Sequence, residues 1–420
     1  MNKPAKSPKW MTAEEAVAAI DDGMQIGFPH LSAEPRALTS ALWQRAEALN
    51  EITVVSGMLL SGYKFLMGPV ASKIRFKTWF MPGTLLRKTT GDVKAEYLPL
   101  TYAQIARYLN EVPMDVALVQ VSPADENGYH SLGLTCTTSK PMIERAKLVI
   151  AQVNPNVPRT LGDSLVHSSQ FDILVDAPEE LLEYPSRDIE EIDDVIGCQV
   201  AELIPDGATL SFGVGGIPAS AARALIKAGR KDLHFINTFT DPVMELIEAG
   251  CACEENPKGH IGDIFGTKAL YEWVADNPAI ELADALTTHT PEAFVKRKTV
   301  YSVNSALEVD LLGQVNAETI GNKQSGAMGG LVDFAVGGQV EGGQFILGLR
   351  SQTNSGKPRI VAKLDGDIVS LSRTFVETVV TEYGIAHLRN KSVYERAIAL
   401  AAIAHPDDRA ALLEVAESLR

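Results

Sequence analysis

The sequence predicts an α/β protein with two tandem, structurally similar α/β domains whose sheets are largely parallel. Three observations support this prediction. Strand-like runs alternate with amphipathic helices along most of the 420 residues, a pattern typical of βα units. The pattern restarts near the middle of the chain. An acidic stretch with two prolines, residues 177–194, separates the two halves.

The first half contains apolar runs of the length and composition expected for strands. These runs cover residues 24–28, 51–58, 74–81, 115–122, 147–153 and 171–177. Between them, residues 35–49 and 101–112 show the spacing of amphipathic helices. Strands that alternate with helices in this way form parallel sheets covered by helices on both faces.

The acidic stretch APEELLEYPSRDIEEIDD (177–194) has no strand character. We therefore predict an N-terminal α/β domain over 1–185 and a C-terminal α/β domain over 186–420. A helix is expected over 192–204, and the acidic run DIEEIDD before and within it is interpreted as a solvated helix start rather than a cation site.

The restart after this stretch indicates a duplicated unit. DGMQIGFPHLSAEPRALTSAL (22–42) can be aligned with DGATLSFGVGGIPASAARAL (206–225), because both show Asp-Gly, a strand, a loop, a proline and a helix. EITVVSGM (51–58) has its counterpart in LHFINTF (233–239). The loop of the second copy is the richer in glycine.

Composition excludes several classes of function. The formal net charge of −15 argues against nucleic-acid and anionic-membrane partners, which select basic surfaces. No apolar stretch approaches the ~20 residues needed to span a bilayer.

The N-terminal MNKPAKSPKWMTAEEAV has no apolar run after its lysines, so a cytoplasmic location is expected. The cysteines and histidines show no metal-ligand spacing, so no metal is expected.

The stretch TLSFGVGGIPASAARALI (209–226) is the first candidate site. Gly213, Gly215 and Gly216 follow a predicted strand, and Pro218 opens a helix. Such a loop brings backbone N–H groups close to a ligand, so it suits a phosphate or a developing oxyanion. A tight βα connection without a ligand is the alternative. A nicotinamide dinucleotide is disfavoured, because the third glycine of that fingerprint is absent.

Further along, residues 320–344 are rich in glycine, and the next segment is basic. Arg350, Lys357, Arg359 and Lys363 lie close together in an otherwise acidic protein. A cluster of this kind suits a phosphorylated ligand, whereas a solvated surface loop is the simpler alternative.

Several long motifs occur in an order that is characteristic of one family. They are VSPADENGYHSLGLT (121–135), GVGGIP (213–218), FGTKALYEWVADNPAIEL, VNSALEVDLLGQVNAETIG, SGAMGGLVDF and VVTEYGIAHLRNKSVYERA. On these motifs, nearly the whole chain resembles the acetyl-CoA hydrolase/transferase family of class I CoA transferases, of the 4-hydroxybutyrate CoA-transferase type.

The resemblance implies an enzyme that transfers CoA between an acyl-CoA thioester and a small carboxylic acid, with coenzyme A present as the substrate thioester. It also implies a homodimer or a larger homo-oligomer. In the family, a glutamate attacks the thioester and forms covalent intermediates. Positions that match those holding CoA and the thioester oxygen are Val214, Gly215, Gly216, Ile217, Pro218, Asn304, Gly329, Gly330 and Arg359.

The sequence departs from the family at the nucleophile. In LHFINTFTDPVMELIEAG (233–250), alignment on Asp241 places Asn237 where the family has its glutamate. An amide carries no charge and is a poor nucleophile. Asp241 is the nearest carboxylate, and His234 is the histidine to consider as an acid or base. A structural role within the strand is an equal alternative for His234.

Three interpretations therefore remain open. In the first, another carboxylate supplies the nucleophile: Asp241 and Glu245 are near in sequence. Glu34 lies on the equivalent loop of the first domain, where a structural role is expected. Alternatively, the chain is an acyl-CoA hydrolase that uses water, with Asn237 donating a hydrogen bond. The third interpretation is a catalytically silent acyl-CoA-binding protein.

Overall fold

The computed structural model describes residues 7–82, 95–186, 188–297, 299–321, 323–366 and 368–420. The first six residues of the N-terminal segment considered above lie outside these ranges. The chain forms two compact units, Met1–Pro185 with Gly259–Thr288, and Ser186–Lys258 with His289–Arg420. Each unit is thus formed from two separate stretches, and the domain boundary at residue 185 stays a prediction.

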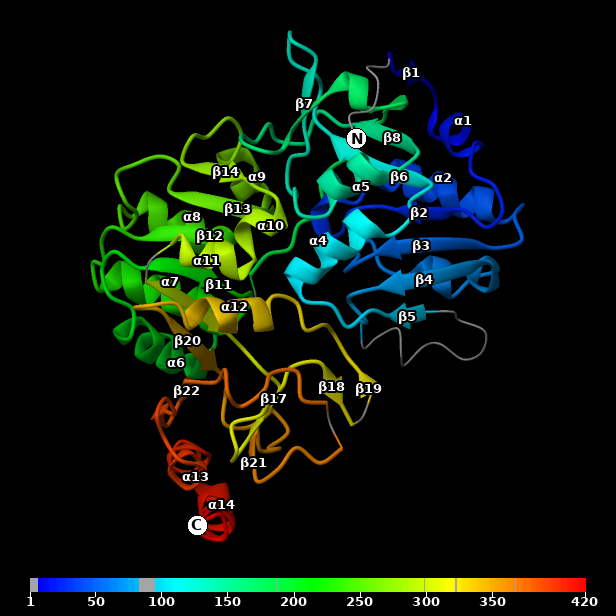
Figure 1. Cartoon of the computed structure of the whole chain (residues 1–420). Coiled ribbons are helices and arrows are strands. Elements are labelled where there is room, and N and C mark those ends of the chain that lie inside the picture. Colours follow the sequence, from blue (N-terminus) through cyan, green and yellow to red (C-terminus); the bar gives the residue numbers. More distant parts are fainter. Residues whose placement is uncertain (1–6, 83–94, 187, 298, 322, 367) are drawn as a thin grey trace. The chain divides into compact units, whose positions relative to one another are not determined.

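The first unit is built on an eight-stranded sheet in which every pair of neighbouring strands is parallel. Figure 1 shows its central strands side by side. In spatial order the strands are β1 (Lys9–Trp10), β10 (Ile173–Asp176), β8 (Leu148–Val153), β6 (Val116–Val121), β2 (Gln25–Gly27), β3 (Ile52–Ser56), β4 (Ile74–Thr78) and β5 (Ala95–Tyr97). The strands predicted for the first half of the chain are therefore confirmed.

Helices in this unit follow the predicted alternation. They are α1 (Ala13–Val17), α2 (Arg36–Ala46), α4 (Tyr102–Glu111), α5 (Ser139–Arg145), α9 (Lys268–Trp273) and α10 (Ala285–Thr288). Helix α4 begins at a capping box, in which Thr101 and Gln104 satisfy each other's backbone N–H groups. Four further short strands form the antiparallel pair β7 (Tyr129–Ser131) with β9 (Leu165–His167) and the parallel pair β13 (Gly259–Ile264) with β14 (Ile280–Leu282).

The second unit repeats the arrangement. Its strands lie side by side in the order β12 (His234–Phe239), β11 (Thr209–Phe212), β15 (Val300–Asn304), β20 (Gln344–Gly348), β22 (Thr378–Thr381) and β23 (Gly384–His387). All neighbours are parallel except β22 and β23, which form an antiparallel pair. The predicted repeat is confirmed as two similar α/β sheets.

Helices and small strand pairs complete this unit. The helices are α6 (Glu191–Glu202), α7 (Gly216–Lys227), α8 (Asp241–Glu248), α11 (Pro291–Val295), α12 (Leu331–Gly338), α13 (Val393–Ala402) and α14 (Pro406–Glu417). The small sheets contain β16 (Glu308–Asp310), β17 (Val315–Asn316) and β21 (Ile360–Val361), and β18 (Thr319–Ile320) with β19 (Lys323–Gln324). In the described part of the chain, no helix is long and apolar enough to cross a membrane.

Each sheet has one point at which the strand order reverses. In the first unit, successive strands run outward in opposite directions from β2 and β6, and in the second from β11 and β15. Loops at the carboxyl ends of the two strands at such a point leave a crevice in which ligands of open α/β sheets bind. The glycine loop of 213–216 follows β11, so the fold places it at the reversal point of the second sheet.

Candidate functional site

The glycine loop joins β11 to α7 by a short turn. Gly215 is the N-cap of α7 and has a φ of 131°, a backbone conformation that side chains with a Cβ rarely adopt. Val214, at the tip of the turn, is 45% exposed, whereas Ile217 and Pro218 are buried in the first turn of α7. The first N–H groups of a helix have no acceptor within the helix and favour an anion.

Asn304 lies beside this loop at the end of the neighbouring strand. The N–H of Gly213 donates to the carbonyl oxygen of Val303 over 2.9 Å, and a Cβ at Gly213 would lie 3.5 Å from Oδ1 of Asn304. Asn304 is only 7% exposed, and its Nδ2 has no hydrogen-bond partner among the described residues. A buried donor without an acceptor is costly in a protein interior, so this amide is suited to a ligand oxygen.

Two buried hydroxyls lie on β11 and β15, each two residues before Gly213 or Asn304. Ser211 and Ser302 are partners in the parallel register of β11 and β15, and both are fully buried. Neither Oγ has a hydrogen-bond partner within the described ranges. Because side chains two residues apart point to the same face of a sheet, Ser302 and Asn304 share one face. Polar groups without protein partners therefore gather toward the glycine loop.

A second glycine pair caps a second helix of this unit. Gly330 is the N-cap of α12, and Gly329 before it has a φ of 55°. Helix α12 lies in the chain between the parallel neighbours β15 and β20. A helix that connects parallel strands runs back across the sheet, so its N-terminus lies toward the carboxyl ends of the strands. Gly329 and Gly330 are thus at the same edge of the sheet as Asn304.

Arg359 carries the partly buried cation of this region. It donates from Nη1 to the carbonyl oxygen of Ala306 over 3.2 Å, and its Nε has no partner in the described structure. Burial lowers the pKa of Arg359 from its ordinary value, and the nearby charge of Arg350 adds to that effect. The Arg359 guanidinium is partly buried and forms no ion pair within the described ranges. Such a cation suits an anionic ligand.

Arg350 itself is already neutralised. It contacts the carboxylates of Asp193 at 2.8 Å and Glu190 at 3.0 Å. Hydrogen bonds to Asp193 and then to Glu190 raise the pKa of Arg350 above its usual range. The predicted set of four available cations is therefore wrong for Arg350. DIEEIDD does form the start of helix α6, but its interpretation as solvated is wrong for Asp193, whose side chain is buried in this ion pair.

Asn237 is in β12 and is completely buried. Its φ is 77°, inside the left-handed region, which is uncommon for a residue within a strand although asparagine tolerates it better than most. Backbone strain of this kind collects at functional sites. The position that matches the family nucleophile therefore keeps a special backbone conformation, even though its side chain is an amide.

Asp241 and His234 lie at opposite ends of the β12 segment. Asp241 is the first residue of α8, directly after the carboxyl end of β12, and is half-buried. His234 is the first residue of β12 and pairs with Thr209, the first residue of β11. The structure therefore brings Asp241 to the edge that holds the glycine loop and leaves His234 at the other edge. Catalytic roles for Asn237, Asp241 and His234 stay predictions.

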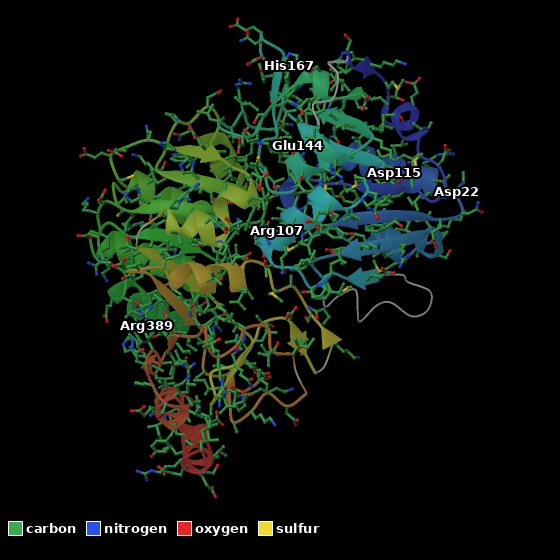
Figure 2. All side chains as sticks on the ribbon, viewed as in Figure 1. Asp22, Arg107, Asp115, Glu144, His167 and Arg389 are labelled. Carbon is green, nitrogen blue, oxygen red and sulfur yellow. The ribbon has the colours of Figure 1, made fainter. Side chains whose placement is uncertain are left out.

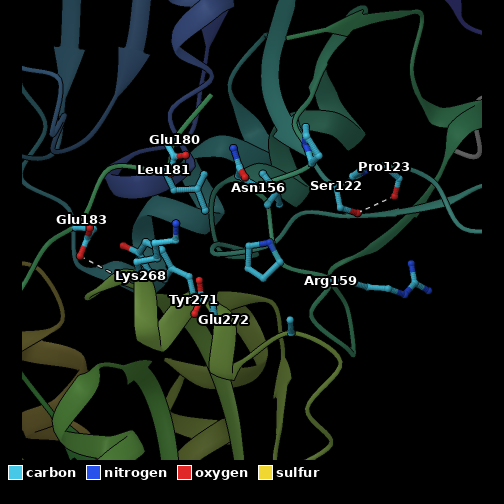
Figure 3. Close-up of a pocket in the computed structure, with 14 residues that line it drawn as sticks. Ser122, Pro123, Asn156, Arg159, Glu180, Leu181, Glu183, Lys268, Tyr271 and Glu272 are labelled. Atoms are coloured by element: carbon cyan, nitrogen blue, oxygen red, sulfur yellow. Dashed lines mark hydrogen bonds between the residues drawn. The ribbon is translucent and has the colours of Figure 1, made fainter. Parts of the chain in front are cut away.

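The first unit contains a pocket of about 440 Å³, within the range of small-molecule sites. Figure 3 shows Lys268 and Tyr271 of α9 opposite Asn156 and Ser122, which follow β8 and β6. Its lining carries acidic as well as basic side chains, including Glu183 and Arg159. None of the site residues predicted from the sequence lines this pocket.

A buried polar network in the first unit was not anticipated. Asp263 accepts hydrogen bonds from Tyr102 at 2.6 Å and from Thr137 at 2.7 Å, and His30 lies 3.8 Å from it. Burial alone would raise the pKa of Asp263, but the hydrogen bond and charge of His30 and the hydroxyl donors lower it. These residues are far apart in the sequence, so no local pattern signals the network.

No group of three or more His, Cys, Asp or Glu side chains in the described structure is arranged to hold a metal ion. Cys136, Cys251 and Cys253 are buried free thiols, and Cys198 is an exposed one.

Comparison with known proteins agrees with this geometry. Residues 3–183 match the acetyl-CoA hydrolase/transferase N-terminal domain, and residues 266–416 match its C-terminal domain. The chain is 37% identical over 415 residues to the 4-hydroxybutyrate coenzyme A transferase of Clostridium kluyveri, with 96% of each chain covered. The glycine loop and Asn237 lie between the two matched ranges.

Solved structures give the same relationship. The crystal structure of RipA from Yersinia pestis superposes with a TM-score of 0.90 at 28% identity, covering 98% of this chain and 97% of that one. The 4-hydroxybutyrate CoA-transferase of Porphyromonas gingivalis gives a TM-score of 0.81 at 32% identity, with coverage of 98% and 97%. This chain therefore belongs to the acetyl-CoA hydrolase/transferase family of enzymes.

Proposed function

We propose that this enzyme transfers CoA between an acyl-CoA thioester and a small carboxylic acid. Relatives with this kind of name include the transferase of C. kluyveri and the succinyl-CoA:cyclohexane-1-carboxylate CoA transferase of Geobacter metallireducens, which is 33% identical over 414 residues. The observation that carries the proposal is the position of the glycine loop beside the Nδ2 of Asn304, which has no hydrogen-bond partner among the described residues.

In this proposal, the thioester carbonyl oxygen lies between the loop N–H groups and the amide of Asn304. Negative charge develops on that oxygen when a nucleophile attacks the carbonyl carbon, and fixed donors stabilise it. Arg359 is assigned to an anionic group of CoA, because its guanidinium has no carboxylate partner in the described structure. The N-terminus of α12, capped by Gly330, supplies further N–H groups at this edge of the sheet.

Asn237 cannot be the nucleophile of such a transfer, so we assign that step to Asp241. Its carboxylate oxygen attacks the thioester carbon, the C–S bond breaks, and CoA leaves as a thiolate. The thiolate then attacks the aspartyl carbonyl of the mixed anhydride and releases the first acid. The acceptor carboxylate attacks the aspartyl-CoA thioester and expels the thiolate, which attacks the new acyl carbonyl and regenerates Asp241.

Hydrolysis is the second candidate function, and the amide at position 237 favours it. Asn237 has the backbone conformation described above and no carboxylate, so an attacking water oriented by this amide would give a free acid and CoA. No second carboxylic acid takes part in that reaction.

An assay with a panel of acyl-CoAs, with and without carboxylic acids, separates these functions. Formation of a new acyl-CoA that depends on the added acid is the expected result. Release of free CoA without an added acid would favour hydrolysis. Binding of acyl-CoA without turnover would contradict both functions and leave a silent binding protein.

Two finer statements belong to the same proposal. We infer a homodimer or larger homo-oligomer, and a cytoplasmic location, from the resemblance to the family. Light scattering of the purified chain tests the first, because a monomer at micromolar concentration would contradict it.

A further inference from the structure

The first turn of α6 contacts the glycine loop directly. A Cβ at Gly216 would lie 2.5 Å from Oδ2 of Asp193, a distance that real Cβ atoms do not show. The carboxylate of Asp193 therefore packs against the backbone at the start of α7, and only glycine leaves room for it. A second contact joins the same two helices, because Ser220 donates to Oδ1 of Asp194 over 2.7 Å.

Arg350 holds the Asp193 carboxylate in this place. Its Nε donates to Oδ1 over 3.0 Å and its Nη2 donates to Oδ2 over 2.8 Å, which is a forked arrangement. Glu190 receives a further bond from Nη1 over 3.0 Å. The side chain of Asp193 is 7% exposed and that of Arg350 is 17% exposed. The contact between α6 and the loop is thus fixed by a charge pair that is largely removed from water.

We propose that Asp193, held by Arg350, is a positioning residue that fixes the glycine loop in the conformation that binds CoA. This inference rests on the proposed function, because it assigns a support to the same loop. A glycine-rich turn has many accessible conformations, and ordering it on binding would cost affinity. The Asp193 carboxylate restricts the turn before the ligand arrives, so the donors are already in place.

The matched control is a second forked pair in the same unit. Arg389, labelled in Figure 2, donates to Glu377 from Nε over 2.9 Å and from Nη2 over 2.6 Å. The Glu377 side chain is 12% exposed, close to the value for Asp193. Glu377→Gln and Asp193→Asn therefore make the same chemical change at similarly buried carboxylates, although the arginine is 52% exposed in the control pair and 17% exposed in the pair beside the loop. Only Asp193 touches the loop.

The experiment measures the dissociation constant for CoA by calorimetry and the melting temperature for the wild type and both variants. Both variants are expected to melt at a lower temperature, because each leaves an arginine with a weaker partner. Only Asp193→Asn is expected to weaken CoA binding, by roughly tenfold, which corresponds to about 1.4 kcal/mol. Equal dissociation constants for the wild type and Asp193→Asn would overturn the inference.

A double-variant test keeps the inference falsifiable if stability changes dominate. Gly216→Ala places a methyl group against the Asp193 carboxylate and is expected to weaken CoA binding by itself. Combined with Asp193→Asn, the loss should be smaller than the product of the two single losses, because both changes disturb one contact. A loss of CoA affinity in the double variant equal to the product of the two single losses would overturn the inference. If the wild type does not bind CoA at all, the proposed function fails and this inference fails with it.

Discussion

Gly213, directly after β11, lies beside Asn304, the last residue of the neighbouring parallel strand β15, where the strand order of the second sheet reverses. The N–H of Gly213 is bound to the carbonyl of Val303 over 2.9 Å, and the Asn304 amide is next to the glycine with its Nδ2 unpartnered among the described residues. Gly213 contributes the backbone of a tight turn, and Asn304 contributes a buried N–H donor. Together they define where a ligand oxygen is expected.

Asn304→Ala should lower the turnover of acyl-CoA by about 100-fold, the usual effect of removing one donor to a developing oxyanion. Its effect on the melting temperature should be small, because Nδ2 makes no hydrogen bond within the described ranges. Steady-state kinetics and calorimetry measure the two effects separately.

Asn316→Ala serves as the control for that change. Asn316 is also buried, but its amide donates to the carbonyl of Thr319 over 2.9 Å and accepts from the N–H of Glu318 over 3.1 Å. This variant should lose stability and keep its turnover per folded molecule. An Asn304→Ala enzyme with unchanged turnover would remove Asn304 from the site.

Asn237→Glu should restore the nucleophile of the family and give a covalent CoA adduct at position 237. The added methylene in a fully buried position should cost about 1–3 kcal/mol of stability, and glutamate tolerates a φ of 77° less well than asparagine. Peptide mapping after incubation with acyl-CoA locates the adduct. Asn237→Gln has the same size without the charge, so it should lose stability equally and form no adduct.

Arg359→Gln should raise the KM for acyl-CoA by roughly tenfold, because a charge-assisted contact to an anion is lost. An acyl-pantetheine substrate lacks the phosphates of CoA and should show the same kinetics with both enzymes. Comparison of the two substrates is the decisive measurement. An equal loss with acyl-pantetheine would show that Arg359 does not contact a phosphate.

The buried carboxyl of Glu34 should make the stability of the folded protein depend on pH. It is 4% exposed, and its Oε1 accepts from Ser61 at 2.8 Å and Thr39 at 3.3 Å. Burial raises the pKa of Glu34 above its ordinary value of 4.5, although the hydroxyl donors oppose this. The folded state therefore retains a proton that the unfolded state releases. Stability contributed by the neutral carboxyl is present below 4.5 and is lost as the pH rises through the higher folded pKa.

Glu34→Gln removes this titration. The stability of the variant relative to the wild type should increase as the pH rises from about 4.5, as followed by urea denaturation at several pH values. A difference between the two proteins that stays constant with pH would contradict a raised pKa for Glu34.

The sequence was sufficient for elements with a local pattern. The apolar runs predicted the strands, and the repeated Asp-Gly, strand, loop and proline order predicted that β2 with α2 and β11 with α7 are equivalent. The glycines of 213–216 predicted a turn before a helix for a local steric reason. The reversal of strand order beside that turn depends on how distant strands pair, and no single segment encodes it.

Contacts between residues far apart in the chain could not be predicted from the sequence for the same reason. Asp193 and Arg350 are 157 positions apart, so the first looked like part of a solvated acidic run and the second like an available cation. Likewise, His234 and Asp241 are close in sequence but lie at opposite ends of β12. A strand extends by about 3.3 Å per residue, so its length keeps the two side chains apart. The structure places only Asp241 at the loop edge.

Intact-protein mass spectrometry of the wild type, mixed with a panel of acyl-CoAs and followed by peptide mapping, tests the central claim most directly. The account predicts a CoA adduct on Asp241 that disappears in Asp241→Asn and when a carboxylic acid acceptor is added. The absence of any adduct across acyl-CoAs that are shown to bind would contradict covalent transfer through a relocated carboxylate.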